Sequence, residues 1–179
     1  SKKKTHVIEI HAGQITTTDL TISLPPTLNF EPFGGYSKIA AVERHHNTGK
    51  IGVAVAKGYG IRNGAVASSV SHDSHNIIVI GDNDADMAIA VNEIIRTQGG
   101  YTVVENGKVY ETLALPIMGL MSDAGFENVN EALQRMIQKA HQMGVASQID
   151  PFVTLSFLAL PVIPELRITP RGICKMTAK

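Results

Sequence analysis

The densest group of side chains able to do chemistry lies between Ser68 and Asn76, where the sequence reads Ser-Ser-Val-Ser-His-Asp-Ser-His-Asn. Within this segment His72 and His75 lie close to Asp73, and the segment leads into a short apolar run that is typical of a buried strand. Imidazole beside carboxylate serves proton transfer and metal support, but the same pairing also occurs in structural networks. Two interpretations follow. Either His72, Asp73 and His75 form a functional site, or these polar side chains satisfy one another at the end of a strand.

The spacing of the two histidines limits the metal chemistry. Side chains alternate along a strand, so a His-x-x-His pair on a strand points to opposite faces. His72 and His75 could share one metal ion only in a loop or turn, and we expect no self-contained metal site in this chain. A second polar group, Glu43-Arg44-His45-His46, precedes the turn residues Asn47-Thr48-Gly49. Its simplest interpretation is the solvated end of a hairpin.

Composition and motifs argue against several classes of function. The chain has 179 residues, and its 16 Lys plus Arg balance 16 Asp plus Glu, so no net field favours nucleic acid or an anionic membrane. The most apolar stretch, residues 152–163, is much shorter than the ~20 residues that a bilayer requires. The sequence lacks GxxxxGKS/T, HExxH, CxxC and GxSxG, and tight turns explain Gly58-x-Gly60 better than a dinucleotide fingerprint does. The single cysteine indicates a reducing, cytoplasmic location.

The elements that must position these residues follow from the hydrophobic pattern. Helical periodicity predicts a helix over 84–97 and a second helix that begins with an Asn128–Glu131 capping pair and ends at Gly144. Residues 65–74 show no clear pattern. Short alternating or apolar runs predict strands over 7–10, 17–24, 39–44, 51–56, 76–80, 101–105 and 108–113.

The order of these elements predicts the fold class. It is α/β or α+β, with a layered mixed β-sheet and at least two helices in a single domain over residues 5–179. Residues 1–4 are expected to be a terminal extension outside the fold. Turn residues at Asn47-Thr48-Gly49 and Asn106-Gly107 predict two hairpins, and Pro25-Pro26 is expected to end a strand.

Several longer segments of distinctive sequence run in order along the chain. They are Ala41-Val42-Glu43-Arg44-His45, Lys57-Gly58-Tyr59-Gly60, the run from Gly64 to Ile77, the run from Leu115 to Asp123, and the run from Asp150 to Leu166. Together they resemble the C-terminal domain of bacterial adenine deaminases, which belong to the amidohydrolase superfamily. The resemblance covers the chain from about Val7 onward.

The resemblance implies an activity for the complete enzyme. Adenine deaminases hydrolyse adenine to hypoxanthine and ammonia in purine salvage, using water activated by a divalent metal, expected to be manganese, iron or zinc. In the family the metal ligands begin with a His-x-His pair in a preceding (β/α)₈ barrel. This sequence has no His-x-His pair and is shorter than the ~250 residues of such a barrel. The resemblance thus implies an N-terminal amidohydrolase barrel as partner, adenine as substrate, a homo-oligomer, and no metal held by this chain itself.

Three roles remain open for the domain. In the first, the segment from Ser68 to Asn76 covers the barrel's active site. The candidate catalytic residues are then His72, Asp73 and His75. The candidate substrate-binding residues are Arg44, His45, Ser69, Ser71 and Asn76.

In the second role, the domain is a non-catalytic oligomerisation or structural module. In the third, it is a free-standing enzyme with its own metal site at His72, Asp73 and His75. If the domain docks on a barrel, the apolar segments 115–121 and 152–164 are the expected contact surface, unless both belong to the core.

Overall fold

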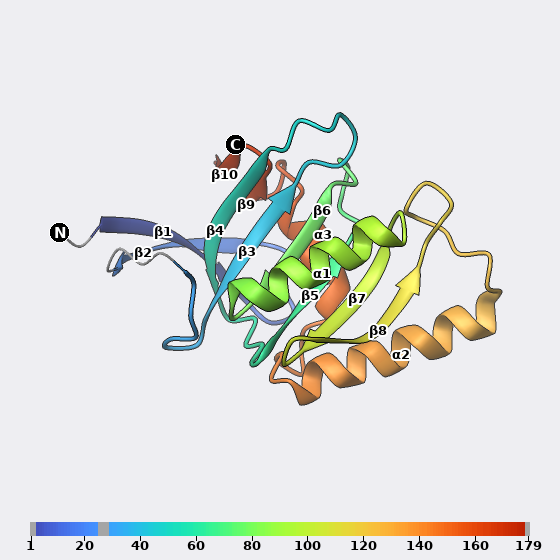
Figure 1. Ribbon diagram of the computed structural model, residues 1–179. Helices are drawn as coiled ribbons and strands as arrows, with labels where there is room; N and C mark the ends of the chain where they lie inside the picture. Colours follow the sequence, from blue (N-terminus) through green and yellow to red (C-terminus); the bar gives the residue numbers. More distant parts are fainter. Residues whose placement is uncertain (1–2, 25–28, 178–179) are drawn as a thin grey trace.

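The chain folds around one large β-sheet (Figure 1). The computed structural model describes residues 3–24 and 29–177, and over these residues it has an eight-stranded sheet, three helices and a separate two-stranded hairpin. The strands of the sheet are β1 Lys3–Ile10, β2 Thr17–Leu24, β3 Tyr36–Val42, β4 Ile51–Lys57, β5 Gly64–Ser68, β6 Ile77–Gly81, β7 Gly100–Glu105 and β8 Lys108–Ala114. The other elements are α1 Asp84–Arg96, α2 Phe126–Gln142, α3 Pro151–Leu158, β9 Glu165–Thr169 and β10 Gly172–Met176.

The strands lie in the order β2-β1-β4-β3-β6-β5-β7-β8. β1 and β4 pair in parallel, whereas the other neighbouring strands of the sheet pair antiparallel. The predicted hairpins, β3–β4 and β7–β8, are both present. Asn106 and Gly107 adopt φ values of 48° and 78°, the left-handed conformation that a two-residue hairpin turn requires. The layered mixed sheet predicted from the sequence is therefore confirmed, in its α+β form.

The β1–β2 hairpin begins earlier in the sequence than expected. β1 begins at Lys3, so it includes two residues that the sequence pattern places in a terminal extension. Ser1, Lys2 and the Pro25-Pro26 pair lie outside the described residues. β1 pairs with β2 along its whole length and with β4 only at Val7–Glu9. The outer part of this hairpin consequently projects from the body of the molecule (Figure 1).

The centre of the sheet is buried on both faces. All five residues of β5 and all five of β6 are buried. The apolar run at 76–80 predicts β6 well, but β5 was not predicted because its residues are small and partly polar. A strand covered on both faces need not alternate in polarity, so the usual signal of a strand is missing from β5.

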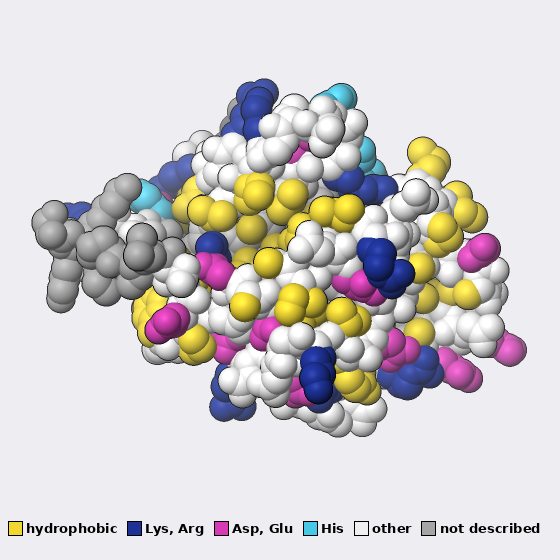
Figure 2. Space-filling view, in the orientation of Figure 1, with side chains coloured by type: hydrophobic (Ala, Val, Ile, Leu, Met, Phe, Trp, Pro, Cys, Tyr) yellow, Lys and Arg dark blue, Asp and Glu magenta, His cyan; other side chains and the backbone are white. Residues whose placement is uncertain are grey.

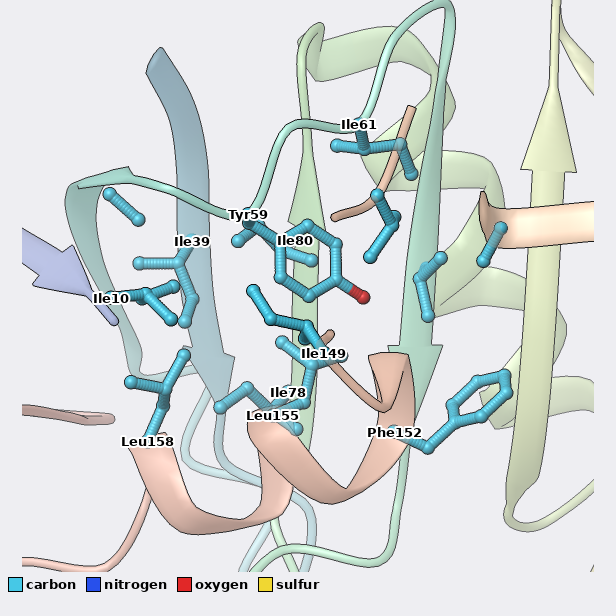
Figure 3. Packing of buried hydrophobic residues seen from close by; sticks show 14 of the residues in the cluster. Ile10, Ile39, Tyr59, Ile61, Ile78, Ile80, Ile149, Phe152, Leu155 and Leu158 are labelled. Atoms are coloured by element: carbon cyan, nitrogen blue, oxygen red, sulfur yellow. The ribbon is translucent and has the colours of Figure 1, made fainter. Parts of the chain in front are cut away.

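Each face of the sheet carries its own core. On one face α1 packs across β5, β6 and β7 through Met87, Ala90 and Ile94. On the other face α2, α3 and the β9–β10 hairpin enclose the larger core. Figure 3 shows residues from the sheet and from α3 that meet in this core, together with the connecting residue Tyr59, among them Ile39, Ile78, Ile80, Leu155 and Phe152.

The start of α1 agrees with the helix predicted over 84–97, whereas α2 begins at a different signal from the one predicted. α1 has Asn83 as its N-cap, and the Asn83 side chain accepts a hydrogen bond from the Asp86 amide at 2.9 Å. α2 begins at Phe126 with Gly125 as cap, so the predicted Asn128–Glu131 capping pair is wrong. α3 was not predicted as a helix; Asp150 caps it and Pro151 occupies its first turn. Among the described residues, the helices are too short or too polar to cross a membrane.

The β9–β10 hairpin is held against the sheet by close backbone contact at Gly52. A side chain at this position of β4 would collide with the Thr169 carbonyl and the Gly172 amide. The glycine therefore lets the hairpin lie directly on the face of β4 that carries Ala54 and Ala56. The opposite face of β4, at Val53, is open to solvent.

Replacing Gly52 with alanine tests this packing. We expect Gly52→Ala to destabilise the chain by roughly 1–3 kcal/mol, because the hairpin must move away from the sheet to make room for the methyl group. The neighbouring Val53→Ala, on the exposed face, should cost about 0.5 kcal/mol. Urea unfolding measures both, and equal midpoints for the two variants would contradict the packing described.

Candidate functional site

The polar segment from Ser68 to Asn76 lies at one end of the sheet, where it links β5 to β6. Because Val42 at the end of β3 pairs with Ile77 at the start of β6, the residues after β3 meet this segment. The Arg44 amide donates to Asn76 Oδ1 at 3.2 Å, and His45 Nε2 lies 2.7 Å from the Ser74 carbonyl oxygen. The two polar groups singled out in the sequence therefore form one cluster.

Arg44 joins four segments of the chain at this end. Its guanidinium donates from Nη1 to the His75 carbonyl at 3.1 Å, and from Nη2 to the carbonyls of Gln98 at 3.3 Å and Met118 at 3.2 Å. Gly119 packs so closely on the guanidinium that a side chain there would collide with it. The donors of Arg44 are thus directed at the protein's own backbone.

The three carbonyls that Arg44 binds share an uncommon backbone conformation. His75, Gln98 and Met118 have φ values of 50°, 60° and 57°. A left-handed conformation at a residue other than glycine costs roughly 1–2 kcal/mol. The charged hydrogen bonds from one side chain offset that cost at three separate places.

Ser69 and Ser71 are buried and hold the segment in place from within. Ser69 Oγ donates to the Gly119 carbonyl at 2.7 Å and accepts from the Gly100 amide at 2.8 Å. Ser71 Oγ donates to the Asn76 carbonyl at 2.7 Å. These hydroxyls face the interior, so their present hydrogen bonds support the loop.

His72 and Asp73 face solvent, unlike the buried Ser69 and Ser71. Their side chains are 50% and 87% exposed, and His72 Nδ1 lies 3.4 Å from Asp73 Oδ1. The His72 ring stacks on Phe157 of α3, with ring centroids 5.5 Å apart and an interplanar angle of 25°. The His72 amide also donates to the Ser156 carbonyl at 3.3 Å. An exposed imidazole and carboxylate are therefore placed on a supported loop.

His75 is placed between these two groups. Its amide donates to the Ser71 carbonyl at 2.8 Å, and its carbonyl accepts from Arg44. Its Nδ1 is buried and has no hydrogen-bond partner within the described part of the chain. A buried polar atom without a hydrogen-bond partner is uncommon, and this one lies in the same loop as the exposed His72–Asp73 pair.

A groove of about 360 Å³ runs beside the segment. Its polar wall consists of Ser71, Asp73, Ser74 and Asn76. Its apolar wall comes from residues 159–162 and 168–170. The volume lies within the range of ~300–1,000 Å³ that is typical of small-molecule sites.

The residues of the cluster do not fit a metal centre. Within residues 3–24 and 29–177, no group of three or more His, Cys, Asp or Glu lies close enough together to hold a metal ion. His72 and His75 are both in the loop, which is the only arrangement in which they could have shared a metal. His72 is instead paired with Asp73, and Nδ1 of His75 is enclosed.

Two residues that support the cluster, Glu43 and Phe157, were not among the candidate site residues, although Glu43 belongs to the second polar group. Glu43 accepts hydrogen bonds from the amides of Thr48, His46 and His45, and these bonds, that of Thr48 above all, lower its pKa to about 2. A carboxylate placed just before a turn could have suggested this role. Phe157, under the His72 ring, gave no local signal because it is distant in sequence.

Removing the Arg44 guanidinium tests whether its hydrogen bonds hold the three backbone segments together. We expect Arg44→Met to cost about 2 kcal/mol, since three carbonyls lose a charged donor. Amide hydrogen exchange at Ile117 and Met121 should also accelerate. The control is Arg135→Met, which removes an exposed ion pair with Glu111 and should change the stability much less than Arg44→Met. Equal losses of stability in urea for Arg44→Met and Arg135→Met would contradict this role of Arg44.

Comparison with known proteins identifies the family to which the chain belongs. A family model described as the adenine deaminase C-terminal domain matches residues 14–179. The adenine deaminase of Desulfitobacterium hafniense (strain Y51) is 50% identical over 168 residues, which is 93% of this chain and 30% of that protein. The adenine deaminase of Bacillus subtilis (strain 168) is 42% identical over 175 residues, which is 97% of this chain and 30% of that protein.

The matches cover most of this chain but only a minor part of each relative. A third relative, the adenine deaminase of Clostridium acetobutylicum, is 53% identical over 140 residues, 78% of this chain and 25% of that protein. The chain thus spans about 30% of the length of the first two relatives. With the family model covering nearly the whole sequence, the chain belongs to the adenine deaminase C-terminal domain family.

Proposed function

We propose that this chain is part of an enzyme that hydrolyses adenine to hypoxanthine and ammonia. The observation that carries the proposal is the match of nearly the whole chain to adenine deaminases, of which it forms about 30%. The remaining part of those proteins is long enough for the barrel that the resemblance implies. In this proposal the metal ion, which activates the attacking water, and its ligands belong to that preceding part.

The domain's own contribution is a rigid loop with two exposed titratable groups. Arg44, Ser69 and Ser71 fix the loop from behind, and the exposed His72–Asp73 pair extends from it. Reactive groups are most effective when the surrounding structure holds their geometry before substrate binds. In the assembled enzyme His72 and Asp73 lie at the mouth of the purine site, where they hydrogen-bond the base or move a proton.

The other candidates then act as positioning residues. Asn76 and His45 make hydrogen bonds to backbone groups of the cluster, as Arg44 does. They set where His72 and Asp73 stand and do not touch the substrate themselves. The enzyme is proposed to be a cytoplasmic homo-oligomer that serves purine salvage, and the single cysteine of this chain is compatible with a reducing compartment.

A non-catalytic assembly module is the second candidate function. Exposed Ile117, Met118 and Met121, which are 44%, 76% and 55% exposed, favour an interface near the cluster. This candidate and the first differ in one respect. Only the first requires the His72 and Asp73 side chains for turnover.

Substitution of the exposed pair in the complete enzyme tests the proposal. We expect His72→Ala and Asp73→Asn each to lower kcat for adenine by about 10²-fold or more, because general acid–base groups typically contribute 10²–10⁴-fold. The pH profile of kcat should also change shape. His6→Ala is the matched control, since His6 is an exposed histidine on β1 that also pairs with a carboxylate, Asp19.

A purely structural role would give a different result. Turnover within about twofold of the parent enzyme, with unchanged pH dependence and unfolding temperature, would contradict a catalytic contribution from the pair. That outcome would favour the assembly module.

A further inference from the structure

β4 carries apolar side chains on both of its faces. Ala54 and Ala56 point into the larger core, and at Gly52 the β9–β10 hairpin covers the same face. Ile51 and Val53 therefore point to the opposite face, where they are 58% and 52% exposed.

These residues form a continuous patch with β3. Val42, which is half-buried, is the cross-strand partner of Ile51, and Ala40 is the partner of Val53. We call Val42, Ile51 and Val53 the β4 strip. Figure 2 shows hydrophobic side chains gathered over β3 and β4, next to α1.

The strip is unusual for a surface exposed to water. Antiparallel sheets with one solvated face normally carry polar residues on that face. α1 covers this side of the sheet at β5, β6 and β7, but it does not extend over the strip. A contiguous apolar surface on a sheet generally marks a contact with another part of the protein or with a partner.

The structure also indicates what covers the strip. More than two thirds of the length of the adenine deaminase relatives lies outside the region that matches this chain. The family model that the chain matches is a C-terminal domain, so in those relatives the unmatched part precedes the matched region. In an enzyme built this way, the preceding part and the strip belong to one polypeptide, which raises the effective concentration of the two surfaces for each other.

We propose that the β4 strip is the docking surface for the N-terminal part of the same enzyme. This inference rests on the proposed function, because it takes the chain to be the C-terminal part of an adenine deaminase. Contacts between domains of one chain typically bury ~600–1,500 Å² in total, so the strip is one apolar centre within a wider interface. The strip lies on the strands that lead to Arg44 and His45, so docking there would also fix the loop of His72 relative to the preceding part.

Thiol labelling of introduced cysteines tests the docking surface. Val53→Cys and Ile51→Cys place probes on the strip, and Val109→Cys is the control. Val109 is 39% exposed and lies on β8, at the opposite edge of the sheet from β2. Labelling is followed by peptide mass spectrometry in this chain alone and in the complete enzyme, which also reports the native Cys174 separately.

We expect both strip probes to label at least about tenfold more slowly in the complete enzyme than in the chain alone, because reagent access is lost. The Val109→Cys probe should change by less than about twofold. Equal rates at the strip in the two proteins would overturn the proposal, and so would equal protection of the strip and control positions. Protection in the chain alone that increases with its concentration would assign the strip to a second copy instead, and would also overturn it.

Adenine turnover by the parent enzyme separates this inference from the proposed function. An active enzyme with a freely labelled strip refutes docking at the strip but leaves the function intact. An inactive protein with a protected strip supports docking and refutes the function.

Discussion

The arrangement at the end of the sheet where the Ser68–Asn76 segment links β5 to β6 depends on the hydrogen bonds of one guanidinium. Arg44 binds carbonyls of His75, Gln98 and Met118, and each of these residues is held in a left-handed conformation that side chains other than glycine seldom adopt. Each of the three turns is unfavourable when considered alone. Their simultaneous formation around one charged donor makes the cluster a single cooperative unit, in which the loop that carries His72 cannot move independently of the loop at 115–121.

Within this unit, buried and exposed side chains differ in what they bind. Ser69 and Ser71 are directed inward and hold the backbone, whereas His72 and Asp73 are directed outward on a supporting Phe157 ring. Side chains that bind the protein's own backbone are poorly placed to bind a substrate, because a new partner would leave a buried group unsatisfied. The division between positioning residues and exposed titratable residues therefore follows from hydrogen bonding, and the enzyme's reacting centre is expected to lie in polypeptide outside this chain.

Sequence reasoning succeeded where a local signal exists. The Asn106-Gly107 hairpin, the buried strand at 77–81 and the capped helix α1 were all predicted from residue type and spacing. The pairing of β3 with β6 brings Arg44 to the His72 segment, and the sequence pattern did not specify which strands pair. β5 was missed because both of its faces are buried, and the capping of α2 was wrong because Gly125, not Asn128, precedes the helix. The support of His72 by Phe157 and the tie between Arg44 and Met118 join residues far apart in sequence, so no local pattern could reveal them.

Adenine turnover by this chain, alone and joined to the preceding part of the enzyme, tests the central claim most directly. The measurement is release of hypoxanthine and ammonia from adenine, with manganese, iron or zinc supplied to both proteins. The account predicts no release above the uncatalysed rate from the chain alone, and sustained release once the preceding part is present. Sustained release from the chain alone would contradict it, because the reacting centre would then lie within these residues.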